Sequence, residues 1–567
     1  MSLTSLVFGL ATKKAAQRFE AATLDTTTTQ RELILAMIRK NAETEYGRKH
    51  GFGSIETLDD WQREVPIISY EDIKADMTRV TEGAQGVFTV EDPIMFAQTS
   101  GTTGDPKYIP LTPSCQGQAQ GDVMRTWLHT AQRAHPDIFS SKILSLVSPA
   151  IEGHVPSGVP FGSMSGQMYR DQNWLVRRAY PIPYPVFEIA DYEAKYYAIM
   201  RAGVAADVRL LVTANPSSVL KMSEKADQFA EEIIRDVRDG TLSQNFDIEP
   251  EIRRTLTARF KPDPGRAKEL ADARSLRGGK LLPADYWKRL SLIGCWKGGT
   301  VGHYVDKFGD WFDPDGTRPI PVRDMGYLSS EVRGSVPLSD EGSEGALTIA
   351  GNFFEFVEVD DLESKKDDWS SWNVFTADQI EVGKEYYIFV STTGGLYRYD
   401  INDVIRVEGH YNTDPQIVFL RKGRGMTNIT GEKVSVNQVI LSVQLASKAT
   451  GTVPGHFKAE ADIARGRYLF RVEFATQVDD THRKAFLRAL DDNLKAINIE
   501  YKAKRDSERL NAPILHVMRE GWYERARRAQ AAAGKRVFQA KTEVLTANKA
   551  LTMDIKPELE AIVEMSD

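Results

Sequence analysis

Polar residues with helical spacing dominate the first ninety positions of the chain. Residues 32–38 form one amphipathic window of apolar and charged side chains. Further on, Ser69 can cap a helix and Asp72 follows it by three residues, which is the spacing of a capping box. We therefore predict a helical N-terminal region, with one helix beginning directly after Ser69.

Short apolar runs in the next two hundred residues predict a parallel sheet. Lys142–Ser148, Val208–Thr213 and Ser291–Cys295 have the length and composition of buried strands. Asn215 and Pro216 follow the second run at once and supply an N-cap residue and a proline suited to the first helical turn. A strand that passes directly into a helix is the step that builds parallel sheets.

Between residues 345 and 420 the pattern changes to closely spaced β-type runs with Gly and Asp turns between them. The runs are Leu347–Ile349, Phe353–Val357, Tyr386–Val390 and Gln416–Leu420. This spacing predicts a β-rich, barrel-like subdomain within a larger α/β domain.

A glycine-rich basic segment, Arg421–Gly425, is the best candidate for a domain hinge. Beyond it, His456–Phe474 has the pattern of two strands, and apolar positions between Phe486 and Ile497 share one helix face. The predicted fold class is α/β. A large N-terminal domain of mixed and parallel sheets spans residues 1–423, and a hinge joins it to a small α/β C-terminal domain over residues 424–567.

Composition narrows the class of protein. The chain has 567 residues, 41% of them hydrophobic and 27% charged, which is typical of a globular protein. A formal net charge of -7 gives no reason to expect nucleic acid or an anionic membrane as partner. Cys115 and Cys295 are the only cysteines, which fits a reducing compartment, and no run approaches the ~20 apolar residues of a membrane span. We expect a cytoplasmic monomer that has no nucleic-acid or membrane partner.

The stretch Thr99-Ser-Gly-Thr-Thr-Gly-Asp-Pro-Lys107 carries the clearest chemistry in the sequence. Glycines let a backbone approach a ligand closely, and exposed N–H groups together with hydroxyls form an anion site. A lysine at the end of the stretch adds a mobile positive charge. Only two residues separate the glycines, so the stretch predicts a polyphosphate loop that is not of the Walker type. The residues concerned are Ser100, Gly101, Thr102, Thr103, Gly104 and Lys107.

Two further stretches offer what a nucleotide site needs besides phosphate donors. In Met325–Glu331, an aromatic ring can stack on a base, two hydroxyls can bind phosphate, and a carboxylate can hold Mg²⁺, which prefers oxygen ligands. In Leu396–Asp403, a carboxylate can accept hydrogen bonds from ribose hydroxyls, with an arginine nearby. The candidate residues are Tyr327, Ser329, Ser330 and Glu331 in the first stretch, and Arg398 and Asp403 in the second.

Each stretch also has an ordinary structural explanation. A loop rich in Gly, Ser and Thr can be a surface turn, and Ser-Ser-Glu can be a helix cap with an acidic first turn. Tyr-Arg-Tyr-Asp can be a strand followed by a turn. The combination and order of the three stretches favour a nucleotide site.

Together the three stretches resemble the motifs of the adenylate-forming superfamily, which includes luciferases and acyl-CoA synthetases. Their particular forms, over Thr99–Thr112, Tyr327–Glu331 and Tyr397–Asp403, are similar to those of its Gretchen-Hagen branch, the auxin-responsive acyl-acid amido synthetases. Segments at Asn41–Phe52 and Asn428–Lys433 also resemble that branch, and the likeness extends over most of the chain.

The resemblance implies a two-step ligase that uses ATP and Mg²⁺. A carboxylic acid attacks the α-phosphate to give an acyl-adenylate and pyrophosphate, and the amine of an amino acid then displaces AMP to form an amide. The loop residues would hold the phosphates, Tyr327 would face adenine, Glu331 would bind Mg²⁺ and Asp403 the ribose. Lys433 and Lys541 resemble the lysines that meet the nucleotide during adenylation, where positive charge offsets the developing negative charge. The hinge would let the small domain swing between the two half-reactions.

Three positions depart from the pattern of the branch. Asn402 stands where the third motif usually has glycine, and asparagine tolerates a left-handed backbone better than most residues. The residues around Lys541 also differ. Val332-Arg-Gly334 follows Glu331 where plant members often carry an aromatic residue, which bears on the substrate and not on the class of reaction.

Two other functions stay open at the level of sequence. One keeps the adenylation but transfers the acyl group to coenzyme A or another amine. The other is a catalytically silent nucleotide-binding protein. Pro156–Gly166 is predicted to be a flexible loop, which either borders the acyl pocket or lies on the surface. For His303, a structural role is favoured over an acid–base role.

Overall fold

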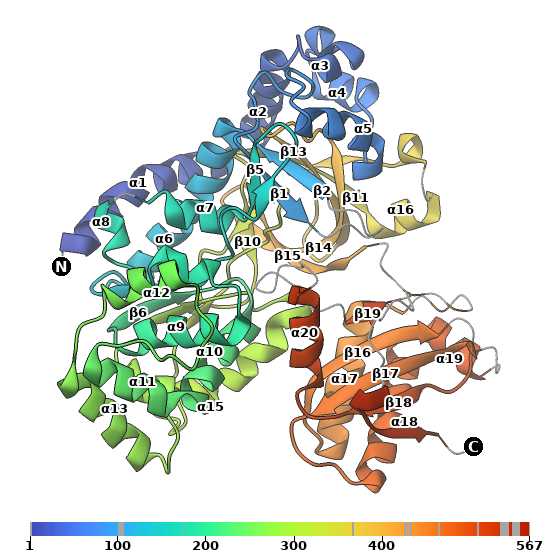
Figure 1. The fold of residues 1–567 in the computed structure, drawn as a ribbon. Coiled ribbons are helices and arrows are strands. Elements are labelled where there is room, and N and C mark those ends of the chain that lie inside the picture. The colour runs from blue at the N-terminus through green and yellow to red at the C-terminus, as the bar shows by residue number, and fades with distance from the viewer. Residues whose placement is uncertain are drawn as a thin grey trace. The chain divides into compact units, whose positions relative to one another are not determined.

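A computed structural model of the chain describes residues 3–99, 107–172, 174–365, 368–423, 427, 429, 432, 434–462, 465–506, 510–532, 544–546 and 556–565. The chain divides into two compact units, residues 1–419 and 420–567, and each is described by itself. Helices and strands are labelled in Figure 1.

The N-terminal region is helical, as its polar, periodic sequence predicts. Helix α5 begins at a capping box, in which the Ser69 N–H donates to the Asp72 carboxylate at 2.7 Å. The buried faces of these helices pack on the sheets that follow. The five helices are α1 (Leu3–Thr23), α2 (Thr26–Lys40), α3 (Glu45–Lys49), α4 (Leu58–Glu64) and α5 (Tyr70–Thr81).

A four-stranded parallel sheet in the order β3-β6-β7-β8 confirms the predicted β-to-α architecture. The Asn215 side chain accepts the N–H of Ser217 at 2.9 Å and caps the helix that follows β6. All carboxyl ends of such strands meet at one edge, where α/β proteins bind ligands. The strands are β3 (Lys142–Ser145), β6 (Val208–Val212), β7 (Leu292–Gly294) and β8 (Val322–Arg323).

Helices α9, α10 and α12 are labelled beside β6 of this sheet in Figure 1. The helices of this part of the chain are α6 (Asp122–Ala134), α7 (Met164–Arg170), α8 (Trp174–Arg177), α9 (Tyr192–Val204), α10 (Pro216–Gln228), α11 (Ala230–Asp239), α12 (Pro250–Thr257), α13 (Pro264–Leu276), α14 (Pro283–Tyr286) and α15 (Phe308–Phe312).

A small mixed sheet in the order β2-β1-β5-β4 corrects one expectation. Residues 156–166, expected to be a flexible loop, contain strand β5 and the start of α7. A Cβ at Gly162 would lie 2.1 Å from the Ala150 carbonyl oxygen, so this glycine permits close packing and does not indicate flexibility. The strands are β1 (Met95–Thr99), β2 (Lys107–Leu111), β4 (Gly153–His154) and β5 (Pro160–Gly162).

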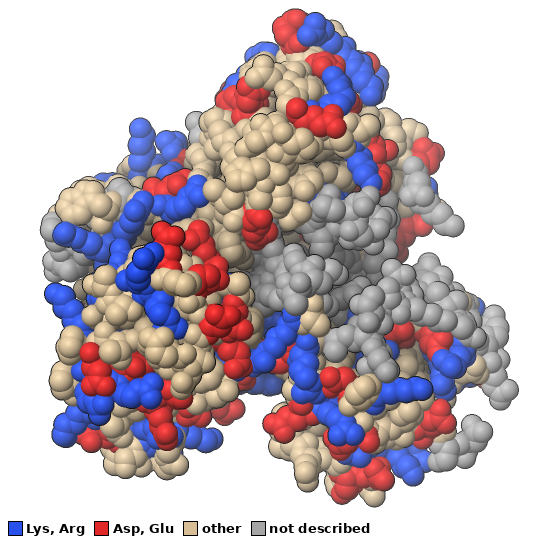
Figure 2. All heavy atoms as spheres, in the orientation of Figure 1, with Lys and Arg blue, Asp and Glu red and all other residues tan. Residues whose placement is uncertain are grey.

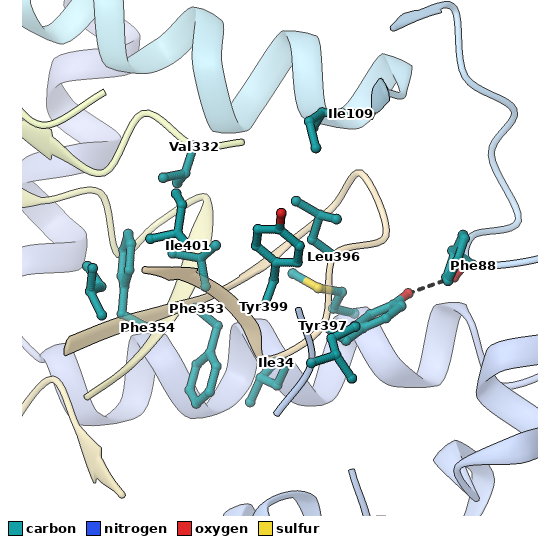
Figure 3. Packing of buried hydrophobic residues seen from close by; sticks show 14 of the residues in the cluster. Ile34, Phe88, Ile109, Val332, Phe353, Phe354, Leu396, Tyr397, Tyr399 and Ile401 are labelled. Carbon is teal, nitrogen blue, oxygen red and sulfur yellow. Dashed lines mark hydrogen bonds between the residues drawn. The ribbon is translucent and has the colours of Figure 1, made fainter. Parts of the chain in front are cut away.

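The β-rich region is a seven-stranded sheet in the order β12-β11-β13-β14-β15-β10-β9, with antiparallel neighbours such as β11–β13 and β13–β14. Its apolar face belongs to a large buried cluster that also includes α2, α5 and β1 (Figure 3). The elements are β9 (Ser335–Val336), β10 (Gly345–Leu347), β11 (Asn352–Glu358), α16 (Val359–Lys365), β12 (Phe375–Thr376), β13 (Glu385–Thr392), β14 (Tyr399–Tyr411) and β15 (Asp414–Lys422).

The second unit is a five-stranded mixed sheet in the order β19-β16-β17-β18-β20 with helices, as the α/β pattern predicts. Its core includes Phe486, Leu487, Leu490 and Leu494 from one helix face. The elements are α17 (Val436–Thr450), β16 (Pro454–Asp462), β17 (Arg467–Phe474), α18 (Asp480–Ile497), α19 (Ile499–Asp506), β18 (Ile514–Met518), α20 (Trp522–Ala532), β19 (Leu545–Thr546) and β20 (Leu559–Glu564).

Basic and acidic side chains are interspersed over the face of the molecule drawn in Figure 2, in keeping with the small net charge. Within the described part of the chain, none of the helices has the length and apolar character needed to cross a membrane.

Candidate active site

Two paired strands flank the first motif. Thr99, the last residue of β1, is the antiparallel partner of Lys107, the first residue of β2. The Lys107 ammonium lies 5.3 Å from the centre of the Tyr70 ring, and the Tyr70 hydroxyl accepts the N–H of Tyr108 at 3.0 Å. Helix α5, which begins at Tyr70, therefore fixes both the start of β2 and the lysine. The loop residues predicted to bind phosphate, Ser100, Gly101, Thr102, Thr103 and Gly104, lie outside the described residues.

The second motif forms a tight hairpin and not the helix cap considered above. The Ser329 N–H donates to the Val332 carbonyl at 2.8 Å, and the Gly334 N–H donates to the Tyr327 carbonyl at 2.7 Å. The Ser329 hydroxyl accepts the N–H groups of Glu331 and Val332 at 3.2 and 3.3 Å. Ser329 thus holds the turn, while the half-buried Ser330 and Glu331 form its tip.

Close packing fixes the ring of Tyr327. A Cβ at Gly334 would lie 2.4 Å from a ring carbon of Tyr327, so only glycine fits there. The Phe419 ring lies parallel to it, within 8° and with 6.1 Å between centres. The Tyr327 side chain is 7% exposed. Its hydroxyl donates to Asp403 Oδ2 at 2.9 Å, which joins the second motif to the third.

A β-bulge shapes the third motif. On β14, Asp403 is opposite Ile388 of β13, whereas Asp400 is opposite the very next residue, Phe389, so the two residues between them are extra. Asn402 is one of the extra residues and has φ 54°, the left-handed conformation that the replacement of glycine by asparagine predicts. Bulges beside active sites re-aim side chains. Here the bulge directs Asp403 to Tyr327.

The charge of Glu331 acts on two phenols of the site, Tyr327 and Tyr399. The pKa of Tyr327 is raised well above its usual value, first by burial, then by Asp403, with a further contribution from the charge of Glu331. The pKa of Tyr399 is also raised, first by burial and then by Glu331. The carboxylate at the tip of the hairpin thus acts electrostatically on Tyr399, the first residue of β14.

The segment before α5 joins the first motif to the third. The Ile68 N–H donates to the Arg398 carbonyl at 3.1 Å, and the Asp400 N–H donates to the Ile68 carbonyl at 2.7 Å. In Figure 3, Val332 of the hairpin points toward Ile401, which follows Asp400. Residues 68–70 thus contact both the first motif and the third, and Tyr327 joins the second motif to the third. Together these segments supply a lysine, three phenols and two carboxylates. This set suits a polyphosphate with an attached ribose.

Arg398 was predicted to lie near a bound nucleotide, but its side chain is buried in the core. Its Nε donates to Glu355 Oε2 at 2.9 Å, and both side chains are 1% exposed. One of its Nη atoms donates to the carbonyls of Gln62 and Val65 at 2.8 and 2.7 Å. Arg398 therefore ties α4 to the β-rich sheet in the core, and its backbone, with φ 46°, begins the turn into β14.

Asp324 contributes to the site although no motif in the sequence pointed to it. The carboxylate follows β8, is 4% exposed, and accepts the N–H groups of Lys297 and Gly326, both at 2.6 Å. Burial raises its pKa to about 6, against the effect of these hydrogen bonds. Asp324 thus links the glycine-rich exit of β7 to the residue just before Tyr327. An acidic residue two positions before a glycine, at the end of a strand, was the available signal.

Tyr70 and Tyr399 were also not predicted as site residues, because their sequence neighbourhoods indicated only a helix start and a strand. Lys433 and Lys541 lie outside the described residues, as does the side chain of His303. Among the described residues, no three His, Cys, Asp or Glu side chains form a metal-binding group.

The fold is that of solved acyl acid amido synthetases. A structure described as GH3.15 acyl acid amido synthetase has a TM-score of 0.84 and 19% identity, covering 97% of this chain and 96% of that one. A second, described as AtGH3.15 acyl acid amido synthetase in complex with 2,4-DB, has a TM-score of 0.85 and 20% identity, covering 98% of both chains.

Sequence relatives span the same length. An indole-3-acetic acid-amido synthetase, GH3.3 of Arabidopsis thaliana, is 23% identical over 90% of this chain and 88% of that protein. A jasmonoyl--L-amino acid synthetase, GH3.5 of Oryza sativa subsp. japonica, is 23% identical over 92% of this chain and 93% of that protein. Models of the GH3 family N-terminal, central and C-terminal domains match residues 15–316, 345–422 and 437–550. This chain belongs to the GH3 family, which confirms the resemblance inferred from its motifs.

Proposed function

We propose that this chain is an ATP-dependent acyl-acid amido synthetase. It activates a small carboxylic acid as an acyl-adenylate, releasing pyrophosphate, and then joins the acyl group to the amine of an amino acid, releasing AMP. Membership of the GH3 family and the names of its relatives, which are amido synthetases, support this reaction class. The observation that carries the proposal is the Tyr327–Asp403 hydrogen bond, with Glu331 at the tip of the same hairpin.

Different residues bind different parts of the nucleotide. Lys107 and the predicted loop residues 100–104 bind the phosphates, and Ser330 supplies a further hydroxyl at the hairpin tip. Asp403 accepts hydrogen bonds from the ribose, and Tyr327 faces the adenine. Ser329 contributes by stabilising the turn of the hairpin, and Arg398 contributes by stabilising the buried core.

Glu331 fits Mg²⁺. Mg²⁺ usually takes one or two protein carboxylates together with phosphate oxygens, and not a cage of several acidic side chains. Glu331, half-buried at the hairpin tip, supplies one such carboxylate. When bound, Mg²⁺ would neutralise charge on the phosphates during adenylation.

The remaining expectations belong to the same proposal. Lys433 and Lys541 offset the negative charge that develops at the α-phosphate. A hinge at Arg421–Gly425 between residues 1–423 and 424–567 lets the small domain serve both half-reactions. The enzyme is a cytoplasmic monomer that acts on small molecules, without nucleic-acid or membrane partners.

Acid-dependent exchange of labelled pyrophosphate into ATP tests the first half-reaction. We expect exchange with at least one acid in a broad panel of aryl and alkyl acids, and its absence with all of them would refute the ligase. A screen of the twenty amino acids and coenzyme A then identifies the acceptor. Amide formation supports the proposal, whereas thioester formation alone assigns the chain to a different adenylate-forming activity.

A further inference from the structure

Arg333 belongs to the hairpin of residues 327–334, here called the site hairpin, and has no part in the nucleotide site proposed above. Leu328 and Arg333 are antiparallel bridge partners. The two hydrogen bonds of this bridge join the neighbouring residues and not the pair itself. In such a pair the two side chains lie close together on one face.

The neighbours of the pair show where that face points. Tyr327 and Val332 belong to the buried cluster under β14. Leu328, on the opposite face, packs with a second cluster that contains Trp127 of α6 and Met325. Arg333 therefore lies on the side of the hairpin that faces α6 and the carboxyl ends of the parallel strands.

The lining of this second face is apolar. Half-buried side chains from α6, from the end of β6 and from the exit of β7 pack against the same cluster as Leu328. They are Val123, Met124, Val212 and Trp296. Apolar side chains at the carboxyl edge of a parallel sheet are suited to the non-reacting part of an organic acid.

Within the described part of the chain, no side chain forms an ion pair or hydrogen bond with that of Arg333. The residue is half-buried and not sealed in the core. A half-buried guanidinium that no described acidic side chain pairs with can offer its N–H groups to an anionic ligand.

The reacting end of the substrate is not that anion. Tyr327, whose hydroxyl donates to Asp403, lies on the face of the hairpin opposite to the Leu328–Arg333 pair. Arg333 is therefore on the other side of the hairpin from the carboxylate that would bind the ribose, toward the far end of the acyl group.

We propose that Arg333 binds a second anionic group on the acyl acid, so that the preferred substrates are acids with a further carboxylate distant from the one that reacts. Arginine suits this role because its planar fork can bind a carboxylate through two hydrogen bonds. The inference deepens the proposed function and rests on it.

The test measures pyrophosphate exchange with the panel of aryl and alkyl acids. The panel contains matched pairs of a diacid and a monoacid, such as adipate with hexanoate and terephthalate with 4-methylbenzoate. We expect the best substrate to carry a second carboxylate and to exceed its matched monocarboxylate roughly 10- to 100-fold in kcat/KM. A best substrate that carries no second anion overturns the inference and leaves the ligase proposal intact.

Variants then assign the preference to the residue. Arg333→Leu should remove the preference for the diacid, with little change in the KM for ATP or in exchange with the monocarboxylate. Arg333→Lys should retain part of the preference. Arg406→Leu, which removes an exposed arginine of β14 that pairs with Glu408, is the matched control and should keep it. If Arg333→Leu retains the full preference, the inference is wrong. If no acid supports exchange in the wild type, it is the proposed function that fails.

Discussion

The Tyr327 hydroxyl donates a hydrogen bond to Asp403 Oδ2 across 2.9 Å, although 76 positions separate the two residues in the chain. Tyr327 begins the site hairpin, and Asp403 follows the bulge in β14. Each orients the other: the bond leaves one carboxylate oxygen directed away from the phenol. Recognition of the ribose should therefore depend on a residue that does not touch it.

Substitution of Tyr327 by phenylalanine tests this dependence. We expect Tyr327→Phe to raise the KM for ATP several-fold, because Asp403 loses the bond that orients it, and to lower stability by about 1 kcal/mol. Exchange kinetics at varied ATP and urea unfolding measure the two effects. Tyr386→Phe is the matched control, because that buried phenol accepts the Glu381 N–H in the same sheet. It should lower stability alone, and an unchanged KM for ATP in Tyr327→Phe would contradict the expectation.

Substitution of Lys107 or Glu331 should reduce the exchange rate far more than substitution of Tyr327. Lys107→Ala and Glu331→Ala remove charges that act on the phosphates and on Mg²⁺, and we expect each to reduce exchange by roughly 10² or more. Raising Mg²⁺ should partly rescue Glu331→Gln but not Lys107→Ala, which separates metal binding from phosphate binding. Exchange rates at several Mg²⁺ concentrations are the measurement. Full activity in either alanine variant would remove that residue from the site.

The sequence predicted those parts of the fold and site that local chemistry determines. The Ser69 cap, the Asn215–Pro216 helix start and the left-handed Asn402 depend on residues close together in the chain, and the structure contains all three. Strand periodicity likewise located β6, β13 and β15.

Long-range packing accounts for what the sequence did not reveal. Gly162 suggested flexibility because its partner, the Ala150 carbonyl, is known only from the fold. Arg398 suggested nucleotide binding because Glu355 is 43 residues away. Tyr70 gave only a helix start, since its contact with Lys107 requires the paired β1 and β2.

Arg398 and Glu355 should matter for stability and not for nucleotide binding. Removal of one partner leaves a charge buried, so we expect Arg398→Met to lower the free energy of unfolding by roughly 3–5 kcal/mol. The double variant Arg398→Met with Glu355→Leu should recover part of that loss. Urea unfolding measures both, and the KM for ATP of the folded protein should not change. A stable variant with a raised KM would instead place Arg398 in the nucleotide site.

Protonation of Asp324 should lower the exchange activity in mild acid. Its pKa is raised to about 6, first by burial, so it is ionised above that pH and accepts the Lys297 and Gly326 N–H groups. Protonation below about pH 6 weakens this link and should lower exchange. The same raised pKa means that ionisation of Asp324 costs stability as pH rises, so this group does not itself unfold the protein in acid. Exchange rates between roughly pH 5 and 8 should show the step in the wild type, and Asp324→Asn should be slower and lack it. A step of equal size in both proteins would assign it to another group.

Asp414 should make the protein less stable as pH rises. It begins β15 with 0% of its surface exposed, and neither carboxylate oxygen has a hydrogen-bond partner among the described residues. Burial raises its pKa well above the usual value, so the folded state holds the proton that the unfolded chain releases near pH 4. Between these two pKa values the free energy of unfolding should fall by up to about 1.4 kcal/mol per pH unit from this residue. Asp414→Asn has the shape of the protonated carboxyl group but cannot ionise, so it should not show this loss of stability.

Urea unfolding at pH 5 and pH 7 tests this expectation. The free energy of unfolding of Asp414→Asn should rise relative to that of the wild type from pH 5 to pH 7, whereas Asp59→Asn, at an exposed position, should follow the wild type. A variant that is less stable than the wild type at both pH values would show that Asp414 is ionised and bound in the fold.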